Sequence, residues 1–220
     1  MGEFLELKAE DNHLFSAYIS QPLEKPIAGL VILQEIFGVN AHIKEVTDLY
    51  ASKGYLTIAP ALFDRIESNI ELEYDEEGVN KGRKLKELCD KDALKDIDAA
   101  ISVVSSAGNV GIIGYCWGGS LSWRMACQSN NLSASVCYYG GDIPRLKTLE
   151  PKCSVLTHFG ELDQGIPIDN VEVFKSIKPE VLTYTYPADH GFNCDHRKQF
   201  NEVSAKVALD RTLKFLKCNL

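Results

Sequence analysis

The sequence predicts an α/β protein in which a mostly parallel sheet carries helices on both faces. Runs of apolar residues without polar alternation, such as Ala28–Leu33 and Asn109–Gly114, are typical of strands buried on both faces. Segments with the apolar spacing of a helix separate these runs, and repeated alternation of strand and helix favours a parallel sheet. With 220 residues, 45% of them hydrophobic, the chain can form one core, and we expect a single domain over residues 1–220.

The individual elements follow from local patterns. The turn residues Glu10-Asp11-Asn12 predict a hairpin, Gly54 lies where a helix C-cap is expected, and Phe63–Val79 is acidic and expected to be irregular. The predicted strands are Glu3–Lys8, Leu14–Ser20, Ala28–Leu33, Tyr55–Ala59, Asn109–Gly114, Ser133–Tyr138, Val155–His158 and Val181–Tyr186. The predicted helices are Ala41–Lys53, Asn80–Ser105, Ser120–Ser129, Asp169–Ile177 and Lys198–Leu216.

The charge balance argues against nucleic acid as a partner. There are 23 basic and 31 acidic side chains, so the net charge is −8 and a polyanion is repelled. The basic residues at 81–86 are interleaved with acids, which is typical of a solvated helix face. Residues 1–15 lack the pattern of a signal peptide, and no apolar run reaches the ~20 residues that span a bilayer. We therefore expect a cytoplasmic protein without a membrane partner.

The cysteines predict reduced thiols. Seven are present, an odd number, and none has the C-x-x-C spacing of a zinc or thioredoxin motif. A chain with a sizeable core needs no disulfide for stability. Cys127, Cys137 and Cys153 lie in apolar helix or strand contexts and are expected to be structural.

Cys116 is the candidate nucleophile. It is the centre of G-x-C-x-G in Gly114–Gly118, between a predicted buried strand and a helix. This arrangement indicates a nucleophile elbow, a strained turn with the reactive atom at its tip, as in the α/β-hydrolase fold. A thiol at a helix N-terminus is favoured as thiolate, and the amide of Trp117 is positioned to bind a developing oxyanion. The alternative is a buried structural cysteine beside a glycine turn.

Asp163 and His190 complete a candidate catalytic triad, because the order in this fold is nucleophile, acid, histidine. Each lies in a loop after a predicted strand, Asp163 in Gly160–Pro167 and His190 in Tyr186–Phe192. The alternative for Asp163 is a turn aspartate. His158 ends a strand and fits a core histidine, while His13, His42 and His196 precede the acid or begin a polar stretch. The spacing of His190, Cys194 and His196 is not that of a usual metal site.

These residues, together with Gln34–Asn40 (Q-E-I-F-G-V-N), resemble the dienelactone hydrolase (carboxymethylenebutenolidase) family over roughly residues 5–217. G-Y-C-W-G-G, Y-Y-G-G at Tyr138–Gly141, G-x-x-D-x-x-x-P and H-G-F occur in the family's order. The resemblance implies hydrolysis of a lactone ester. It also implies that Glu35 pairs with the resting thiol and helps to deprotonate it, and that the amide of Ile36 is a second oxyanion donor beside Trp117. Tyr139 is a candidate substrate-binding residue.

The substrate-binding positions depart from the family. Two arginines bind the substrate carboxylate in the family's dienelactone hydrolases, and here Cys194 and Val79 occupy those positions. Arg197 and Arg83 lie nearby in sequence and are the candidate substitutes. The resemblance therefore implies the reaction more firmly than the substrate.

The sequence thus favours a hydrolase that cleaves a small ester or lactone through a thioester acyl-enzyme, with no metal or organic cofactor. Two other functions stay open. One is a ligand-binding relative without catalysis, against which the ordered triad residues argue. The other is a redox-sensing protein in which Cys116 is oxidised reversibly.

Overall fold

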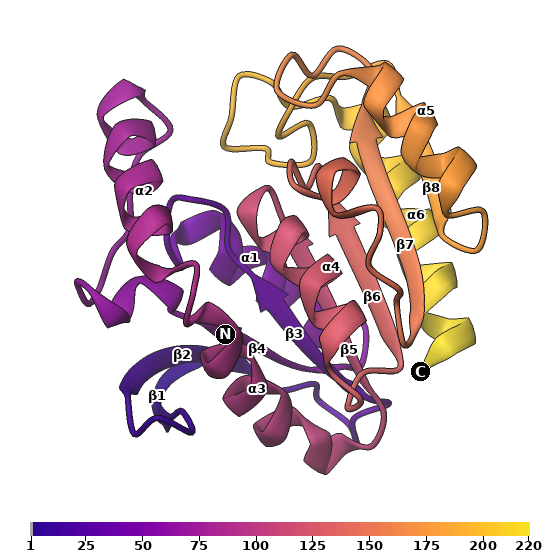
Figure 1. Cartoon of the computed structure of the whole chain (residues 1–220). Coiled ribbons are helices and arrows are strands. Elements are labelled where there is room, and N and C mark those ends of the chain that lie inside the picture. The colour runs from indigo at the N-terminus through magenta and orange to yellow at the C-terminus, as the bar shows by residue number, and fades with distance from the viewer. Residues whose placement is uncertain (1) are drawn as a thin grey trace. The chain divides into compact units, whose positions relative to one another are not determined.

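The alternation of strand and helix is confirmed in a computed structural model that describes Gly2–Leu220. The chain folds into two compact units, one up to Ile112 and the other from Ile113 to Leu220. The division falls inside a strand, β5 (Val110–Tyr115), all of whose residues are buried. Each unit is described separately below (Figure 1).

The strands of the first unit lie in the order β1-β2-β4-β3-β5. The predicted hairpin is confirmed, since β1 (Glu3–Lys8) pairs antiparallel with β2 (Leu14–Ser20). β2 also pairs antiparallel with β4 (Leu56–Pro60), and β4 pairs parallel with β3 (Gly29–Leu33). All five residues of β3 are buried, which is why its sequence has no polar alternation.

Helices cover both faces of these strands, with α1 (Ala41–Ser52) on one side and α3 (Ala93–Val104) on the other (Figure 1). Asn40 caps α1, because its side chain accepts a hydrogen bond from the Ile43 amide at 3.3 Å. At the other end Gly54 adopts φ +99°, a left-handed conformation that suits glycine and confirms the predicted end of the helix.

The prediction of one long helix over Asn80–Ser105 is wrong. The structure has α2 (Glu76–Cys89), a turn, α3, and a 3₁₀ turn η2 (Ser105–Ala107). The apolar spacing of four residues continues across the break through buried residues and so hid it from the sequence: Leu85, Cys89, Ala93, Ile97 and Ile101. The segment expected to be irregular contains a 3₁₀ turn η1 (Leu62–Arg65) and the first turn of α2, which Asp75 caps at the Gly78 amide.

The strands of the second unit lie in the order β5-β6-β7-β8. β6 (Ala134–Tyr138), β7 (Ser154–Gly160) and β8 (Leu182–Tyr186) pair in parallel. α4 (Trp117–Gln128) lies on one face and α6 (Glu202–Asn219) on the other, while α5 (Ile168–Ile177) connects β7 to β8 (Figure 1). A short 3₁₀ turn, η3 (Ile143–Leu146), follows β6.

Two helix starts differ from the prediction. α4 begins at Trp117 rather than Ser120, because Cys116 itself is the N-cap residue. α6 begins at Glu202 rather than Lys198, because the Asn201 side chain accepts a hydrogen bond from the Ser204 amide and so fixes the start there. Within the described part of the chain, no helix combines the length and the apolar character needed to cross a membrane.

Candidate active site

Cys116 occupies a strained turn between β5 and α4. Its backbone has φ +56° and ψ −113°, outside the regions that non-glycine residues prefer. The Cys116 amide donates to the Tyr138 carbonyl at 3.0 Å, and its carbonyl accepts from the Ser120 amide at 3.2 Å. The surrounding bonds therefore hold a conformation that the residue alone would avoid, with the side chain at the tip of the turn.

Two glycines make this turn sterically feasible. A Cβ on Gly114 would collide with the Gly118 carbonyl, and one on Gly119 would lie 2.5 Å from the Tyr138 carbonyl oxygen. Both contacts are closer than a side-chain carbon tolerates. The glycines on either side of Cys116 are thus required by the close passage of the backbone.

The loops that carry Asp163 and His190 are joined by backbone hydrogen bonds. Asp163 follows β7 and His190 follows β8, both at the carboxyl ends of parallel strands. The Glu161 amide donates to the Tyr186 carbonyl at 2.8 Å, and the Leu162 amide donates to the Ala188 carbonyl at 3.0 Å. These bonds bring the acid and the imidazole together although 27 residues separate them.

The Asp163 carboxylate is buried and well bonded. One oxygen accepts the Gly165 and Ile166 amides at 2.8 and 3.2 Å. The other lies 2.6 Å from Nδ1 of His190. An aspartate fixed by backbone donors in this way orients the ring and selects the tautomer that donates through Nδ1.

His190 interacts with both of the other triad candidates. Burial by itself would lower the pKa of His190. The negative charge of Cys116 and the hydrogen bonds with Asp163 and Cys116 outweigh burial and raise the pKa of His190 to about 10. The surroundings therefore favour the imidazolium form of His190.

Four other buried or half-buried cysteines lie in surroundings that disfavour the thiolate form. Burial raises the pKa of Cys89 and Cys153 to about 11 and that of Cys127 to about 12. It also raises the pKa of the fully buried Cys137. None of the seven cysteines, all of which lie within residues 2–220, forms a disulfide. Thiols with raised pKa values stay protonated near neutral pH and react slowly.

Tyr139 packs against the imidazole. Its ring centroid lies 5.0 Å from that of His190 and 5.5 Å from that of Phe192. Like Cys116, Tyr139 follows a strand with a positive φ, here +38°. Its side chain is buried beside the ring of His190, and contact with the substrate stays a prediction.

His158 has the environment of a core histidine. Its two ring nitrogens bond the hydroxyls of Tyr186 at 2.8 Å and Thr212 at 3.0 Å. Thr212 in turn bonds the Tyr138 hydroxyl at 2.7 Å. Burial, with a contribution from the positive charge of Arg211, lowers the pKa of His158 to about 3, so the ring is neutral.

Four of the residues named from the sequence belong to the first unit. Glu35 follows β3 and is buried, and Ile36 beside it is half-buried. Arg83 is exposed on α2, and Val79 lies one turn before it on the same helix. Their chemical roles stay predictions.

The remaining two candidates lie close to His190 in the second unit. Cys194 is fully buried, and its amide donates to the Gly191 carbonyl at 3.0 Å. The guanidinium of Arg197 lies against Gly191, since a Cβ there would approach its Nε to 2.8 Å. Arg197 is thus the arginine that the fold brings next to the loop of His190.

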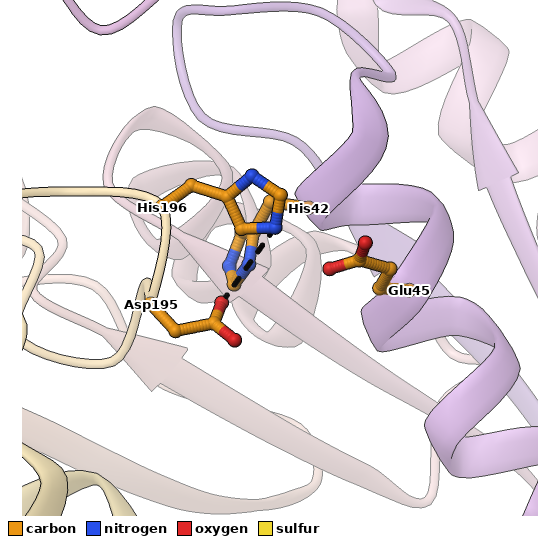
Figure 2. Close-up of side chains that lie close together, drawn as sticks. All are labelled: His42, Glu45, Asp195 and His196. Atoms are coloured by element: carbon orange, nitrogen blue, oxygen red, sulfur yellow. Dashed lines mark ion pairs between the residues drawn. The ribbon is translucent and has the colours of Figure 1, made fainter.

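Two pairs of polar residues are drawn in Figure 2, and each lies within one unit. His42 and Glu45 lie one turn apart on α1, where His42 is buried and Glu45 is exposed. Asp195 and His196 are neighbours in the loop before α6, with 3.9 Å between Asp195 Oδ1 and His196 Nε2.

Sequence reasoning missed three buried residues that support the candidate triad from within the core. Tyr138, Thr212 and Phe192 are all fully buried, and Phe192 packs on Tyr186 with 5.0 Å between ring centroids. The H-G-F motif pointed to Phe192 without giving it a role. Nothing local marked Thr212, which lies inside an ordinary helical pattern on α6.

Known proteins resemble this chain along most of its length. A carboxymethylenebutenolidase of Pseudomonas putida is 30% identical over 98% of this chain and 96% of its own. A Synechocystis protein assigned as a carboxymethylenebutenolidase is 31% identical over 95% of this chain and 94% of its own. A solved structure from Klebsiella pneumoniae, assigned as a dienelactone hydrolase, has a TM-score of 0.78 and 27% identity, covering 97% of this chain and 98% of its own.

The likeness in structure defines the class of protein, an enzyme with the α/β-hydrolase fold. Residues 15–220 match the dienelactone hydrolase family. The chain belongs to this family, and it is a carboxylic-ester hydrolase.

Proposed function

We propose that this protein hydrolyses a small ester or lactone through a thioester on Cys116. The observation that carries the proposal is the position of the His190 imidazole, which bonds Asp163 at 2.6 Å and also interacts with Cys116. A thiol next to an imidazole, with a carboxylate that orients the imidazole, is the arrangement used for nucleophilic acyl transfer. No step of the proposed reaction calls for a metal or an organic cofactor.

The first half of the reaction acylates the enzyme. The thiolate of Cys116 attacks the carbonyl carbon, a C–S bond forms, and the carbonyl electron pair moves to oxygen. When the resulting oxyanion collapses, the bond from carbon to the alkoxide breaks. The imidazolium of His190 gives its proton to the leaving oxygen, so the alcohol leaves neutral and the imidazole becomes neutral.

The second half restores the enzyme. Neutral His190 takes a proton from water, and the hydroxide attacks the thioester carbon. The C–S bond then breaks, which releases the acid and returns the thiolate beside the imidazolium. For a lactone substrate, the alcohol and the acid are two ends of one product, so ring opening needs both halves as well.

The oxyanion needs hydrogen-bond donors during both halves. Trp117 is the first residue of α4, and amides in the first turn of a helix are directed toward its N-terminus, where a negative charge is favoured. We assign the Trp117 amide as one donor and Ile36 as the expected second donor. Glu35, which is buried after β3, is proposed as the base that takes the Cys116 proton whenever the thiol form is present, which yields the thiolate that attacks.

The substrate class is a small ester or lactone. Arg197 is a candidate to bind the substrate, because its guanidinium lies against Gly191 beside His190. A guanidinium binds carboxylate through paired, charge-assisted hydrogen bonds. A substrate with a carboxylate near its scissile bond is therefore compatible with Arg197, whereas Arg83 on α2 stays a second candidate.

The experiment is a burst assay with a chromogenic activated ester. The wild type should give a burst with one equivalent of alcohol, and intact mass spectrometry should detect an acyl adduct on Cys116. Cys116→Ala should lose the burst and about 10⁴-fold or more of kcat. The matched control is Cys153→Ala, another half-buried cysteine. It should retain both.

The two other functions give different results in the same assay. A ligand-binding relative would turn over no ester in either protein. A redox-sensing protein would show Cys116 oxidised by peroxide but no acyl adduct. If Cys116→Ala kept more than about a tenth of wild-type kcat, Cys116 would not be the nucleophile.

A further inference from the structure

The second unit contains a cavity that lies away from the candidate triad. It is a groove of about 370 Å³ between the flank of β7 and β8 and the last turns of α6. Its lining begins at Ser154 and Glu180, near the amino ends of these strands, whereas Asp163 and His190 follow their carboxyl ends. None of the three triad residues lines it. Catalysis as proposed above gives this groove no role.

The body of the groove is apolar. Val155 and Phe215 form a buried base, and Leu182 at the rim remains 50% exposed. β8 is the last strand of the sheet among the described residues, so its outer side has no neighbouring strand. Leu182 is half-exposed beside Phe215 in a concave position. Covering such a leucine with an apolar ligand is favourable, because apolar surface is removed from water.

Two cations project into the same groove. Arg211 lies over the Tyr184 ring, with 3.9 Å from its Cζ atom to the ring centroid. Stacking uses the face of the guanidinium, and its edge hydrogen-bonds the Tyr186 hydroxyl. A guanidinium has five N–H donors, so others remain for a ligand. Lys214, one turn further along α6, is exposed. Among residues 2–220, neither Arg211 nor Lys214 is paired with a carboxylate.

The acid in the groove does not cancel these charges. Glu180 lies at one end, and its nearest cation is Lys178, at 3.9 Å between Oε1 and Nζ. The protein as a whole carries a net charge of −8, and the groove has two cations against the single acid Glu180. They lie where a ligand in the apolar groove would present its head group.

We propose that this groove binds a small amphiphilic anion, a carboxylate joined to an apolar chain or ring. The carboxylate accepts hydrogen bonds from Arg211 and Lys214, and the apolar part covers Leu182 and Phe215. Charge-assisted hydrogen bonds provide the selectivity for an anion, and the buried apolar area provides the remaining affinity. The proposal does not depend on the identity of the nucleophile.

Cys218 allows the site to be observed directly, because it is exposed and lines the groove. The full-length protein is labelled with N-ethylmaleimide, and the rate at Cys218 is followed by peptide mass spectrometry. Octanoate should slow this labelling in a saturable way. Octyltrimethylammonium, with the same chain and the opposite charge, should bind about tenfold more weakly or not at all.

Charge variants test the head-group contact. Lys214→Gln and Arg211→Gln should each weaken octanoate protection about tenfold. The matched control, Lys217→Gln, removes an exposed lysine of α6 that does not line the groove, and it should leave protection unchanged. Ester hydrolysis by all three variants should stay near the wild-type rate.

Several outcomes would overturn the proposal. One is equal protection by the carboxylate and the ammonium probes. Another is unchanged protection in a folded Lys214→Gln variant, which keeps the test decisive even if Arg211→Gln fails to fold. A third is the loss of protection when Cys116 is replaced by alanine, because this would assign octanoate binding to the active site.

Discussion

At the scale of single residues, the charge state of His190 decides the chemistry. An isolated imidazole has a pKa near 6.5, and burial would lower it further. Here the electrostatic interaction with Cys116 and the hydrogen bonds with Asp163 and Cys116 reverse that tendency and raise the pKa of His190 to about 10. A resting enzyme with an imidazolium already has the proton that the leaving alcohol needs.

This pKa has a consequence for stability against pH. The folded protein holds a proton on His190 between pH 6.5 and about 10 that the unfolded chain releases. The contribution of His190 to stability is therefore complete below pH 6.5 and is lost as the pH rises toward 10. We expect the gap in Tm between wild type and His190→Gln to shrink steadily over this range. A gap that widens with pH would contradict the protonated resting state.

His158 illustrates the opposite case, a histidine that serves the core. His158→Ala should destabilise the fold by about 3 kcal/mol, because the hydroxyls of Tyr186 and Thr212 lose their partner in a buried place. The kcat of the folded fraction should stay within a few-fold of wild type. His190→Ala serves as the comparison, with no turnover even in its folded fraction. A stable but inactive His158→Ala would contradict this division of roles.

The pKa of His158 also predicts acid sensitivity. The folded pKa of about 3 lies below the unfolded value of 6.5, so the unfolded chain binds the extra proton in this window. The contribution is present above pH 6.5 and is lost as the pH falls toward 3.

At the scale of elements, steric constraints in the turn between β5 and α4 hold Cys116, the proposed nucleophile. A residue at φ +56° costs free energy, and the backbone bonds from Tyr138 and Ser120 offset that cost. The turn can close only because Gly114 has no side chain where the Gly118 carbonyl passes it. Strain and glycine placement are thus two aspects of one device.

A pair of alanine substitutions separates this steric requirement from the mere loss of a glycine. Gly114→Ala should lower Tm strongly and reduce ester hydrolysis by at least about tenfold, since its Cβ meets the Gly118 carbonyl. Gly141→Ala is the control, because nothing lies within 4 Å of a Cβ there and its φ is not positive. Thermal melts and burst amplitudes measure both effects. Equal tolerance of the two variants would remove the steric explanation.

At the scale of the whole molecule, the question is whether the two compact units behave as one domain. The division between them falls within β5, and every residue of that strand is buried. Independent domains are normally joined by exposed linkers with few contacts. A boundary inside a buried strand instead favours a single cooperative unit, in keeping with the expectation of one domain over residues 1–220.

Calorimetry tests this expectation. The chain should unfold in one transition whose calorimetric and van't Hoff enthalpies agree. Two resolved transitions, or a calorimetric enthalpy well above the van't Hoff value, would mean that the units unfold separately. Urea unfolding followed by tyrosine fluorescence in wild type and Gly141→Ala provides an independent measurement.

Local patterns were sufficient for most strands and for the elbow. The hairpin Glu3–Lys8 and Leu14–Ser20 was predicted to the residue, because exposed and buried positions and a turn signal mark it unambiguously. The break between α2 and α3 was not predicted, since the spacing of buried residues continues through it. Periodicity reports which face is buried, and it does not report whether the backbone hydrogen bonds continue.

The sequence by itself determined the class of this protein, its family and the order of its candidate triad, because each rests on short motifs read along the chain. Only the tertiary structure decided which side chains meet. It joined Asp163 to His190 across 27 residues, placed His158 in the core, and set Arg211 beside Leu182 and Lys214 in a groove. Such contacts depend on strand order and on the packing of α6, which motifs and periodicity do not encode.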